Sequence, residues 1–417
     1  MRKAKIIYAI IVLVFVIAII FLRGSKSLDG QALNIDTPGK SPLAQRIRII
    51  QQNGGRVDWS PSGNNLIAFD AKNSDGYFDL YTMTPAGAIV NSLTSGNSLI
   101  NQRHNGDPVW HPSGKYIIFK SEEQNNYAVV HLTKEQEQWI ANPGIGIYNN
   151  LWAAEPDGSQ FWKLTFNQAN GSPSLGVLFP RFSHDGKKLV WSERYDDCYG
   201  ETGCQPGINS GKWRIKIADF VDSKSGPYLA NTTVLLQQPL ASTGFYVVPM
   251  GFSPDDTKLL VAGNLNGQHE YGMDEYILNI DTKTWRVTSF INLTNTSQDW
   301  EEGACWSPDG RYIIYMSDAG SNLSFNKSWT QQLDKYRTDY YIMNADGSNK
   351  QRLTYFNDPT APEYAGGLVI AGQCVFSPDG AKFTGLISSS TGIKDIMVDL
   401  GILDIVPPLA PTELTIS

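Results

Sequence analysis

The chain has 417 residues and a formal net charge of −7, from 41 acidic and 34 basic residues. This length exceeds that of a typical domain, and a hydrophobic content of 41% is enough to build a large core. An acidic chain with no cluster of lysine and arginine repels phosphate backbones, so we expect no nucleic-acid partner.

The first 28 residues have the features of a membrane signal. An uninterrupted apolar run at 6–22 follows Arg2, Lys3 and Lys5. The run is long enough for a transmembrane helix kept as a signal anchor, with its basic end inside. A cleaved signal peptide is the alternative. Both interpretations place the rest of the chain in the periplasm or outside the cell, and residues 29–44 are then a linker.

A short sequence motif follows and occurs six times: an aromatic residue, a tight polar turn and an apolar strand. Recurrence roughly every 50 to 70 residues indicates a repeat architecture. The copies are Trp59-Ser-Pro-Ser-Gly63, Trp110-His-Pro-Ser-Gly114, Phe182-Ser-His-Asp-Gly186, Phe252-Ser-Pro-Asp-Asp256, Trp306-Ser-Pro-Asp-Gly310 and Phe376-Ser-Pro-Asp-Gly380.

The fifth copy shows what one unit encodes. Residues 307–310 match a type I turn position by position, with proline second and glycine last. The β-branched and aromatic run 311–316 is a strand, 339–343 is the next, and 350–354 follows a second turn. With the residues before Trp306, these segments make four antiparallel strands, the content of one propeller blade.

Six such blades must close into a ring. We therefore predict an all-β fold, a six-bladed β-propeller of four-stranded antiparallel blades over residues 45–405, preceded by one N-terminal transmembrane helix. Residues 406–417 are a proline-rich C-terminal tail.

The motif, followed by Met343-Asn-Ala-Asp-Gly-Ser348 and Arg352-Leu-Thr354, resembles the TolB-type propeller repeat. The resemblance covers roughly residues 55–400 and implies the fold. It leaves function open, because proteins with this repeat include TolB, the propellers of prolyl-oligopeptidase-like peptidases and an oligogalacturonate lyase.

The four cysteines divide into two pairs. Cys198 and Cys204 lie in one polar loop, where a local disulfide is expected in an oxidising compartment. Cys305 and Cys374 precede the repeat aromatics by one and two residues, so we expect their side chains on different strand faces, as small core residues.

Most long insertions fall on one face of the expected ring. They include 122–148, 193–212 and 318–338. Long loops in a compact domain are usually functional or disordered, so we predict that this long-loop face, over the central channel, is the binding surface.

Eight residues just before the first strands of the blades approach the channel mouth and are weak ligand-binding candidates. They are Arg56, His104, Asp107, Tyr246, Trp300, Glu301, Glu302 and Gln373. Glu301 and Glu302 are neighbours on one strand and point oppositely, so we expect a solvated acidic loop rather than a catalytic pair. The few histidines lack ligand spacing and no Gly-x-Ser-x-Gly motif occurs, so we predict no catalytic residue, metal or cofactor.

These features favour a non-catalytic, membrane-anchored scaffold that binds a protein or peptide on the long-loop face. The alternative is a polysaccharide-acting enzyme, a lyase or hydrolase, with its site at the channel mouth and a glycan as partner.

Overall fold

The computed structural model describes residues 35–123, 138, 141–167, 175–196, 211–237, 246–269, 272–296, 298–321 and 335–401. The expected N-terminal helix, the loop with Cys198 and Cys204, the C-terminal tail and most of the three long insertions lie outside these residues. Over the described part of the chain, no helix has the length and apolar character needed to cross a membrane.

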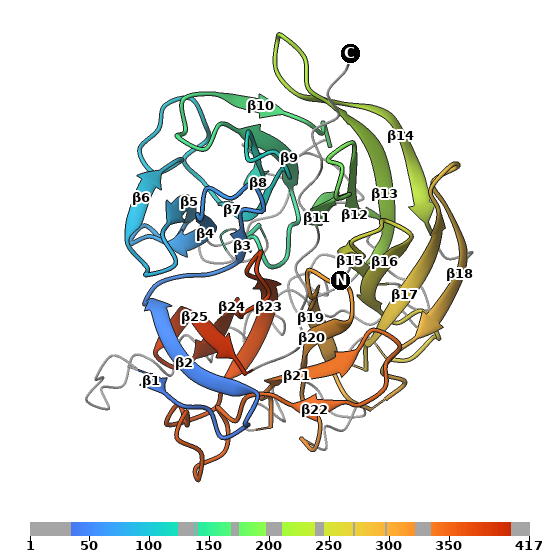
Figure 1. The fold of residues 1–417 in the computed structure, drawn as a ribbon. Helices are drawn as coiled ribbons and strands as arrows, with labels where there is room; N and C mark the ends of the chain where they lie inside the picture. The colour runs from blue at the N-terminus through green and yellow to red at the C-terminus, as the bar shows by residue number, and fades with distance from the viewer. Residues whose placement is uncertain are drawn as a thin grey trace, which may run out of the picture.

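Six antiparallel sheets surround a central axis, which confirms the six-bladed β-propeller (Figure 1). In five blades, four consecutive strands form one sheet, and the first strands of successive blades contact one another around the axis. Blades 1 and 2 comprise β3 Val57–Trp59, β4 Ile67–Lys72, β5 Phe78–Met83 and β6 Ile89–Ser92, then β7 Asn105–Trp110, β8 Ile117–Glu122, β9 Asn149–Ala154 and β10 Phe161–Lys163. Blades 3 and 4 comprise β11 Gly176–Phe182, β12 Lys188–Asp196, β13 Lys212–Val221 and β14 Tyr228–Leu236, then β15 Val247–Phe252, β16 Lys258–Gly263, β17 Asp274–Asp281 and β18 Arg286–Asn292. Blade 5 comprises β19 Glu301–Trp306, β20 Tyr312–Ser317, β21 Asp339–Asn344 and β22 Gln351–Arg352.

Blade 6 joins the two ends of the described chain. Its strands β23 Ile370–Phe376, β24 Lys382–Ser389 and β25 Gly392–Leu400 come last in the sequence, and β2 Ala44–Gln51 pairs antiparallel with β25. In Figure 1 the blue β2 lies beside the red β25. Strand β1 Asp36–Thr37, within the expected linker 29–44, pairs with β2. The N-terminal strands therefore close the ring.

The repeated turn is held by its own side chains. In blade 5 the Ser307 hydroxyl donates to Asp309 Oδ1 at 2.7 Å, and the Gly310 amide donates to the Ser307 carbonyl at 2.8 Å. Gly310 has a φ of 69°, which glycine adopts without steric cost. The same serine–aspartate hydrogen bond occurs at Ser183, Ser253 and Ser377.

A second repeated contact fastens the outer strand. In blade 5 the Thr354 hydroxyl donates to Asp339 Oδ1 at 3.2 Å and accepts the Tyr340 amide at 3.0 Å. Blades 1, 2 and 4 repeat this contact with Asp79–Thr94, Asn150–Thr165 and Asp274–Thr294. The Arg-Leu-Thr end of the repeat is thus the point where the outer strand is tied to the third strand.

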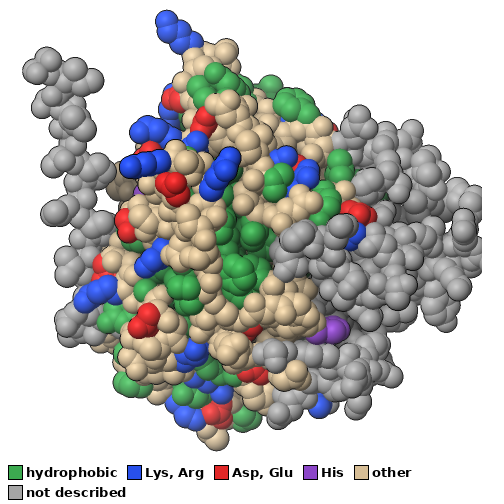
Figure 2. Space-filling model, turned by 90° about the vertical axis from the view of Figure 1, so that its right-hand side faces the viewer, with side chains coloured by type: hydrophobic (Ala, Val, Ile, Leu, Met, Phe, Trp, Pro, Cys, Tyr) green, Lys and Arg blue, Asp and Glu red, His purple; other side chains and the backbone are tan. Residues whose placement is uncertain are grey.

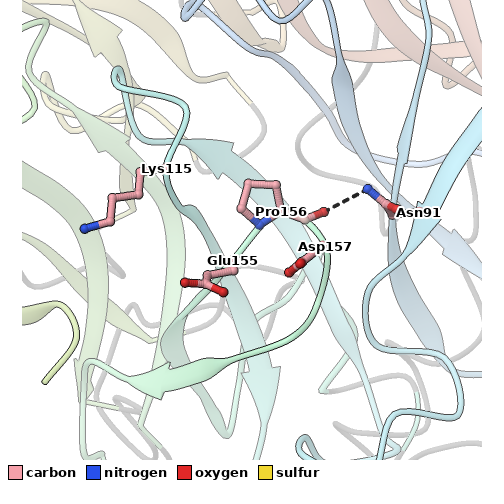
Figure 3. Close-up of a pocket in the computed structure, with 5 residues that line it drawn as sticks. All are labelled: Asn91, Lys115, Glu155, Pro156 and Asp157. Carbon is pink, nitrogen blue, oxygen red and sulfur yellow. Dashed lines mark hydrogen bonds between the residues drawn. The ribbon is translucent and has the colours of Figure 1, made fainter.

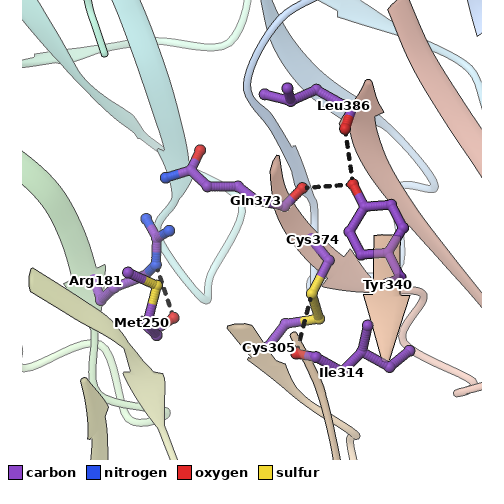
Figure 4. Close-up of a disulfide and its surroundings, with 8 residues drawn as sticks. All are labelled: Arg181, Met250, Cys305, Ile314, Tyr340, Gln373, Cys374 and Leu386. Atoms are coloured by element: carbon purple, nitrogen blue, oxygen red, sulfur yellow. Dashed lines mark hydrogen bonds between the residues drawn. A yellow bond between two sulfur atoms is a disulfide. The ribbon is translucent and has the colours of Figure 1, made fainter. Parts of the chain in front are cut away.

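Cys305 and Cys374 form a disulfide, with their Cα atoms 5.7 Å apart (Figure 4). Our expectation that they are unpaired core residues is wrong. The strand face on which each cysteine lies does not determine whether the two can pair, because they lie on the inner strands of adjacent blades, β19 and β23. A β-bulge just before each cysteine also resets the alternation of side chains.

Candidate active site

The inner strands carry a β-bulge at the same place in blades 2 to 6. In β7 the register shifts between Gly106 and Val109, and in β11 between Leu178 and Arg181. Asp107 and Phe179, within these bulges, have φ values of 53° and 51°, which non-glycine residues seldom adopt. Backbone strain of this kind clusters at functional sites. The part of the channel lined by these bulges is therefore a candidate site.

Asp107 is the centre of a buried ion-pair network. Its carboxylate lies 2.7 Å from Lys120 Nζ, and the two side chains are 1% and 0% exposed. The Gln373 amide donates to Asp107 Oδ1 at 3.4 Å. Burial alone would raise the pKa of Asp107, but neighbouring cations, Lys120 first, hold it below its ordinary value. Burial also lowers the pKa of Lys120 to about 8.

Asp70 connects this network to Arg56. Asp70 Oδ2 lies 3.4 Å from Arg56 Nη1 and accepts the Asp107 amide at 2.8 Å. Asp70 Oδ1 accepts the Arg56 amide at 2.8 Å. A Cβ at Gly55 would lie 1.9 Å from Asp70 Oδ1, so glycine allows the carboxylate to reach the inner strand. The structure thus brings together Arg56, Asp107 and Gln373 of the predicted set.

Glu302 lies on the opposite side of the cluster, in β19. Its carboxylate accepts the Tyr246 hydroxyl and the Trp300 indole N–H, each at 3.3 Å. Burial raises the pKa of Glu302 to about 7, against the lowering effect of these two donors. The side chain nevertheless keeps part of its surface exposed. A carboxyl group that exchanges its proton near neutral pH is suited to general acid–base chemistry.

Asp58 is a second carboxyl group of this kind. It lies in β3, one residue before the repeat aromatic Trp59, and accepts the Trp110 amide at 2.7 Å. Burial raises the pKa of Asp58 to about 7, and it too is partly exposed. Asp58 and Glu302 thus have pKa values of about 7, and burial raises that of Glu301, also in β19, to about 8.

Two of the predicted residues point elsewhere. Glu301 is 2% exposed and accepts the Thr296 hydroxyl at 2.7 Å, so it does not share the partners of Glu302. The expectation of a solvated acidic loop is wrong, because both glutamates belong to β19. His104 is 1% exposed, accepts the Phe78 amide at Nδ1 and lies 2.6 Å from the Gln138 carbonyl through Nε2. Burial lowers its pKa to about 3, so His104 is a neutral packing residue.

Other surfaces of the described residues carry little chemistry. No group of three or more His, Cys, Asp or Glu side chains in the described ranges is arranged to hold a metal ion. A shallow depression of about 380 Å³ lies away from the inner strands, between the β6 edge and the turn after β9, lined by Asn91, Lys115, Glu155, Pro156 and Asp157 (Figure 3). Figure 2 shows acidic and basic side chains interspersed on one face rather than gathered in a patch.

Comparison with known proteins shows the fold. No family model matches the chain. A TolB-type protein from Agrobacterium tumefaciens is 16% identical with a TM-score of 0.43, over 72% of this chain and 79% of that one. An oligogalacturonate lyase from Vibrio parahaemolyticus is 11% identical with a TM-score of 0.45, over 88% and 97%. A luciferin-regenerating enzyme is 9% identical with a TM-score of 0.46, over 84% and 92%.

These similarities agree with the TolB-type propeller expected from the repeats. The prediction of a non-catalytic scaffold is contradicted, because the similar structures include an oligogalacturonate lyase and a luciferin-regenerating enzyme. Structures that share this fold over most of their length include enzymes. At these identities and TM-scores the likeness assigns no reaction to this chain.

Four charged residues of the site were missed from the sequence: Asp58, Asp70, Lys120 and Arg181. Asp70 and Lys120 directly follow the apolar runs 66–69 and 116–119. Asp58 and Arg181 each precede a repeat aromatic by one residue. Comparing the six copies at these two offsets would have found all four.

Proposed function

We propose that the chain is an enzyme that acts on a polysaccharide, as a lyase or a hydrolase, with its site at the mouth of the central channel. The observation that carries this proposal is the Glu302 carboxyl, which accepts hydrogen bonds from Tyr246 and Trp300 and has a pKa raised by burial to about 7. Such a group can both accept and return a proton at neutral pH.

The other groups of the site support either reaction. Glycoside hydrolysis uses one protonated and one ionised carboxyl group. Glu302 in β19 and Asp58 in β3, both with a pKa of about 7, would supply the two forms near neutrality to a saccharide that reaches both strands. A lyase needs a base and a nearby cation to stabilise the developing negative charge. Glu302 and Arg56 are suited to these roles, since Arg56 acts electrostatically on Glu302.

We also propose that the propeller lies outside the cytoplasm, held by the N-terminal segment. The Cys305–Cys374 disulfide supports this location, because such bonds persist mainly in oxidising compartments. Thiol alkylation in freshly broken cells tests it: Cys305 and Cys374 should resist modification until a reductant is added. The predicted protein or peptide partner stays a prediction.

The test uses the purified full-length chain and a panel of acidic and neutral polysaccharides. New reducing ends without ultraviolet absorbance identify a hydrolase, and an absorbing unsaturated product identifies a lyase. Glu302→Gln should lower kcat about 10²- to 10⁴-fold. The control Glu155→Gln, on the β9–β10 turn, should not. Unchanged turnover in the folded Glu302→Gln variant would reject the proposed role of Glu302.

A further inference from the structure

Arg181 is a partly exposed cation with unused donors on the inner strand β11. Its Nε donates to the Met250 carbonyl at 2.9 Å and its Nη1 to the Pro180 carbonyl at 2.7 Å. The guanidinium has five N–H groups, and two are used here, so three have no hydrogen-bond acceptor among the described residues. Two carbonyls therefore fix the direction of the guanidinium without neutralising its charge.

This environment differs from that of other partly buried arginines in the propeller. Those arginines have a carboxylate oxygen within 4.0 Å, whereas none of the described carboxylates lies that close to Arg181. The paired residues are Arg48 with Asp399, Arg56 with Asp70, Arg103 with Glu122, Arg214 with Glu193 and Arg352 with Asp339. Asp107 and Asp58 act on Arg181 electrostatically, but no described carboxylate oxygen lies within 4.0 Å of it, so the fixed guanidinium can take a closer anion from outside.

The charges around Arg181 favour an anion. Its cationic neighbours are Arg56 and Lys120, and Asp107 and Asp70 are the carboxylates that face them. The other facing acids, Asp58 and Glu302, have pKa values of about 7. Below neutral pH these two are mostly protonated, so three cations face two carboxylates. The axial cluster is then positive within a chain of net charge −7.

Gln373 faces this position from the opposite blade. Its side chain is 8% exposed and extends from β23 toward the axis, away from the disulfide (Figure 4). Arg181 extends toward the axis from β11 in the same view (Figure 4). A planar guanidinium with two parallel N–H groups matches a carboxylate, and an amide can complete its contacts.

We infer that Arg181, with Gln373 opposite, receives a carboxylate group of the ligand, so that the saccharide bound at this site is acidic. The inference rests on the proposed function for the class of ligand, a saccharide. The contacts of Arg181 select only for an oxyanion with the shape of a carboxylate. Binding of such a group can therefore be measured even if the protein catalyses no reaction.

Equilibrium binding to the full-length chain tests this inference, with glucuronate as the acidic probe and glucose as its neutral counterpart. Isothermal titration should show glucuronate binding, more weakly at about pH 8 than at about pH 6, as Asp58 and Glu302 become charged and Lys120, with a pKa of about 8, loses part of its charge. Glucose should bind at least about tenfold more weakly. Equal binding of both sugars, or of inorganic phosphate and glucuronate, would overturn the inference.

Three variants separate the possible outcomes. Arg181→Gln should weaken glucuronate binding about tenfold or more, and the exposed Arg286→Gln removes the same charge from β18 and should not. If Arg181→Gln does not fold, Arg181→Lys keeps the charge, loses the planar fork and should still weaken binding. Glu302→Gln should retain glucuronate binding. Turnover surviving in Glu302→Gln would refute only the proposed catalysis, and unchanged glucuronate affinity in the folded Arg181 variants would refute only this inference.

Discussion

Replacing Glu275 with leucine should stabilise the propeller. Glu275 is 0% exposed, and neither of its carboxyl oxygens has a well-formed hydrogen bond among the described residues. Burial raises the pKa of Glu275, and the nearby Ala304 amide lowers it only slightly. The equivalent position in the register holds Tyr340 in blade 5, a second buried acid, Asp395, in blade 6, and the aliphatic side chains Leu80, Leu151 and Ile215 in blades 1, 2 and 3. Those three aliphatic side chains are at most 1% exposed. Leucine therefore already fits this position in the repeat.

The expected gain follows from the cost of the buried acid. Leaving a buried polar group without a partner costs about 1–3 kcal/mol, so Glu275→Leu should raise the free energy of unfolding by about that amount at low pH, where Glu275 is protonated in both states. Burial, followed by the charges of Glu302 and Glu301, raises the pKa of Glu275 well above its ordinary value of 4.5. At pH values below 4.5 both the folded and the unfolded chain are protonated there.

As the pH rises, the unfolded chain loses this proton first, and the wild type loses up to about 1.4 kcal/mol of stability per pH unit until the folded pKa is reached. Glu275→Leu removes this loss. The advantage of the variant should therefore be larger at about pH 8 than at about pH 5.

Guanidinium unfolding followed by tryptophan fluorescence measures both quantities. Glu155→Leu, on a partly exposed turn, is the matched control and should leave stability within about 0.5 kcal/mol. Leu80→Glu is the converse change and should destabilise blade 1. A less stable Glu275→Leu variant, or one with the pH dependence of the wild type, would show that the Glu275 carboxyl is satisfied in the folded protein and that the reasoning is wrong.

Three further changes test the ring. Cys305→Ser removes the bond to Cys374, which spans 69 residues, and should lower the unfolding free energy by about 4 kcal/mol in the chain-entropy model; equal midpoints with and without reductant would contradict this. Ile47→Ala should cost about 2–5 kcal/mol, since Ile47 is buried where β2 closes the ring, while Ile89→Ala at an exposed position of β6 should cost under about 0.5 kcal/mol. Thr354→Val should cost about 1–3 kcal/mol by removing the hydroxyl that ties the third strand of blade 5 to the segment after β22, and equal denaturation midpoints would exclude that role.

The fold was predictable because the turns and contacts of each blade are specified by residues within that blade. The Ser307–Gly310 turn and the Thr354 contact form between residues close in sequence, so their residue types can be recognised without knowing the ring. Ring closure was not predictable in this way. Strand β2 lies at the other end of the chain from its partner β25 and has no copy of the repeated turn.

The disulfide was missed for a related reason. Alternation along a single strand predicts the faces of Cys305 and Cys374 only if the strand is regular. Both inner strands have a bulge just before the cysteine, and the pairing joins two blades. Contacts between blades depend on geometry that no single copy of the repeat contains.

The candidate site arises where one copy departs from the others. One residue before the repeat aromatic, two copies have a charged side chain and the other four do not. These residues are Asp58, Val109, Arg181, Gly251, Cys305 and Val375. Asp58 and Arg181 each bond a backbone group of the next blade, but four blades fold without a charge at this position, so the repeat itself does not require it.

The same comparison between blades can be made in the core at Glu275. The Glu275→Leu variant distinguishes two explanations for an acid at this position. An acid in a position built for leucine is either a tolerated cost or a cost retained for chemistry beside Glu302. If Glu275→Leu gains stability and keeps full turnover, the departure is neutral. If it gains stability and loses turnover, the buried carboxyl belongs to the reaction, as expected where activity depends on a destabilised site.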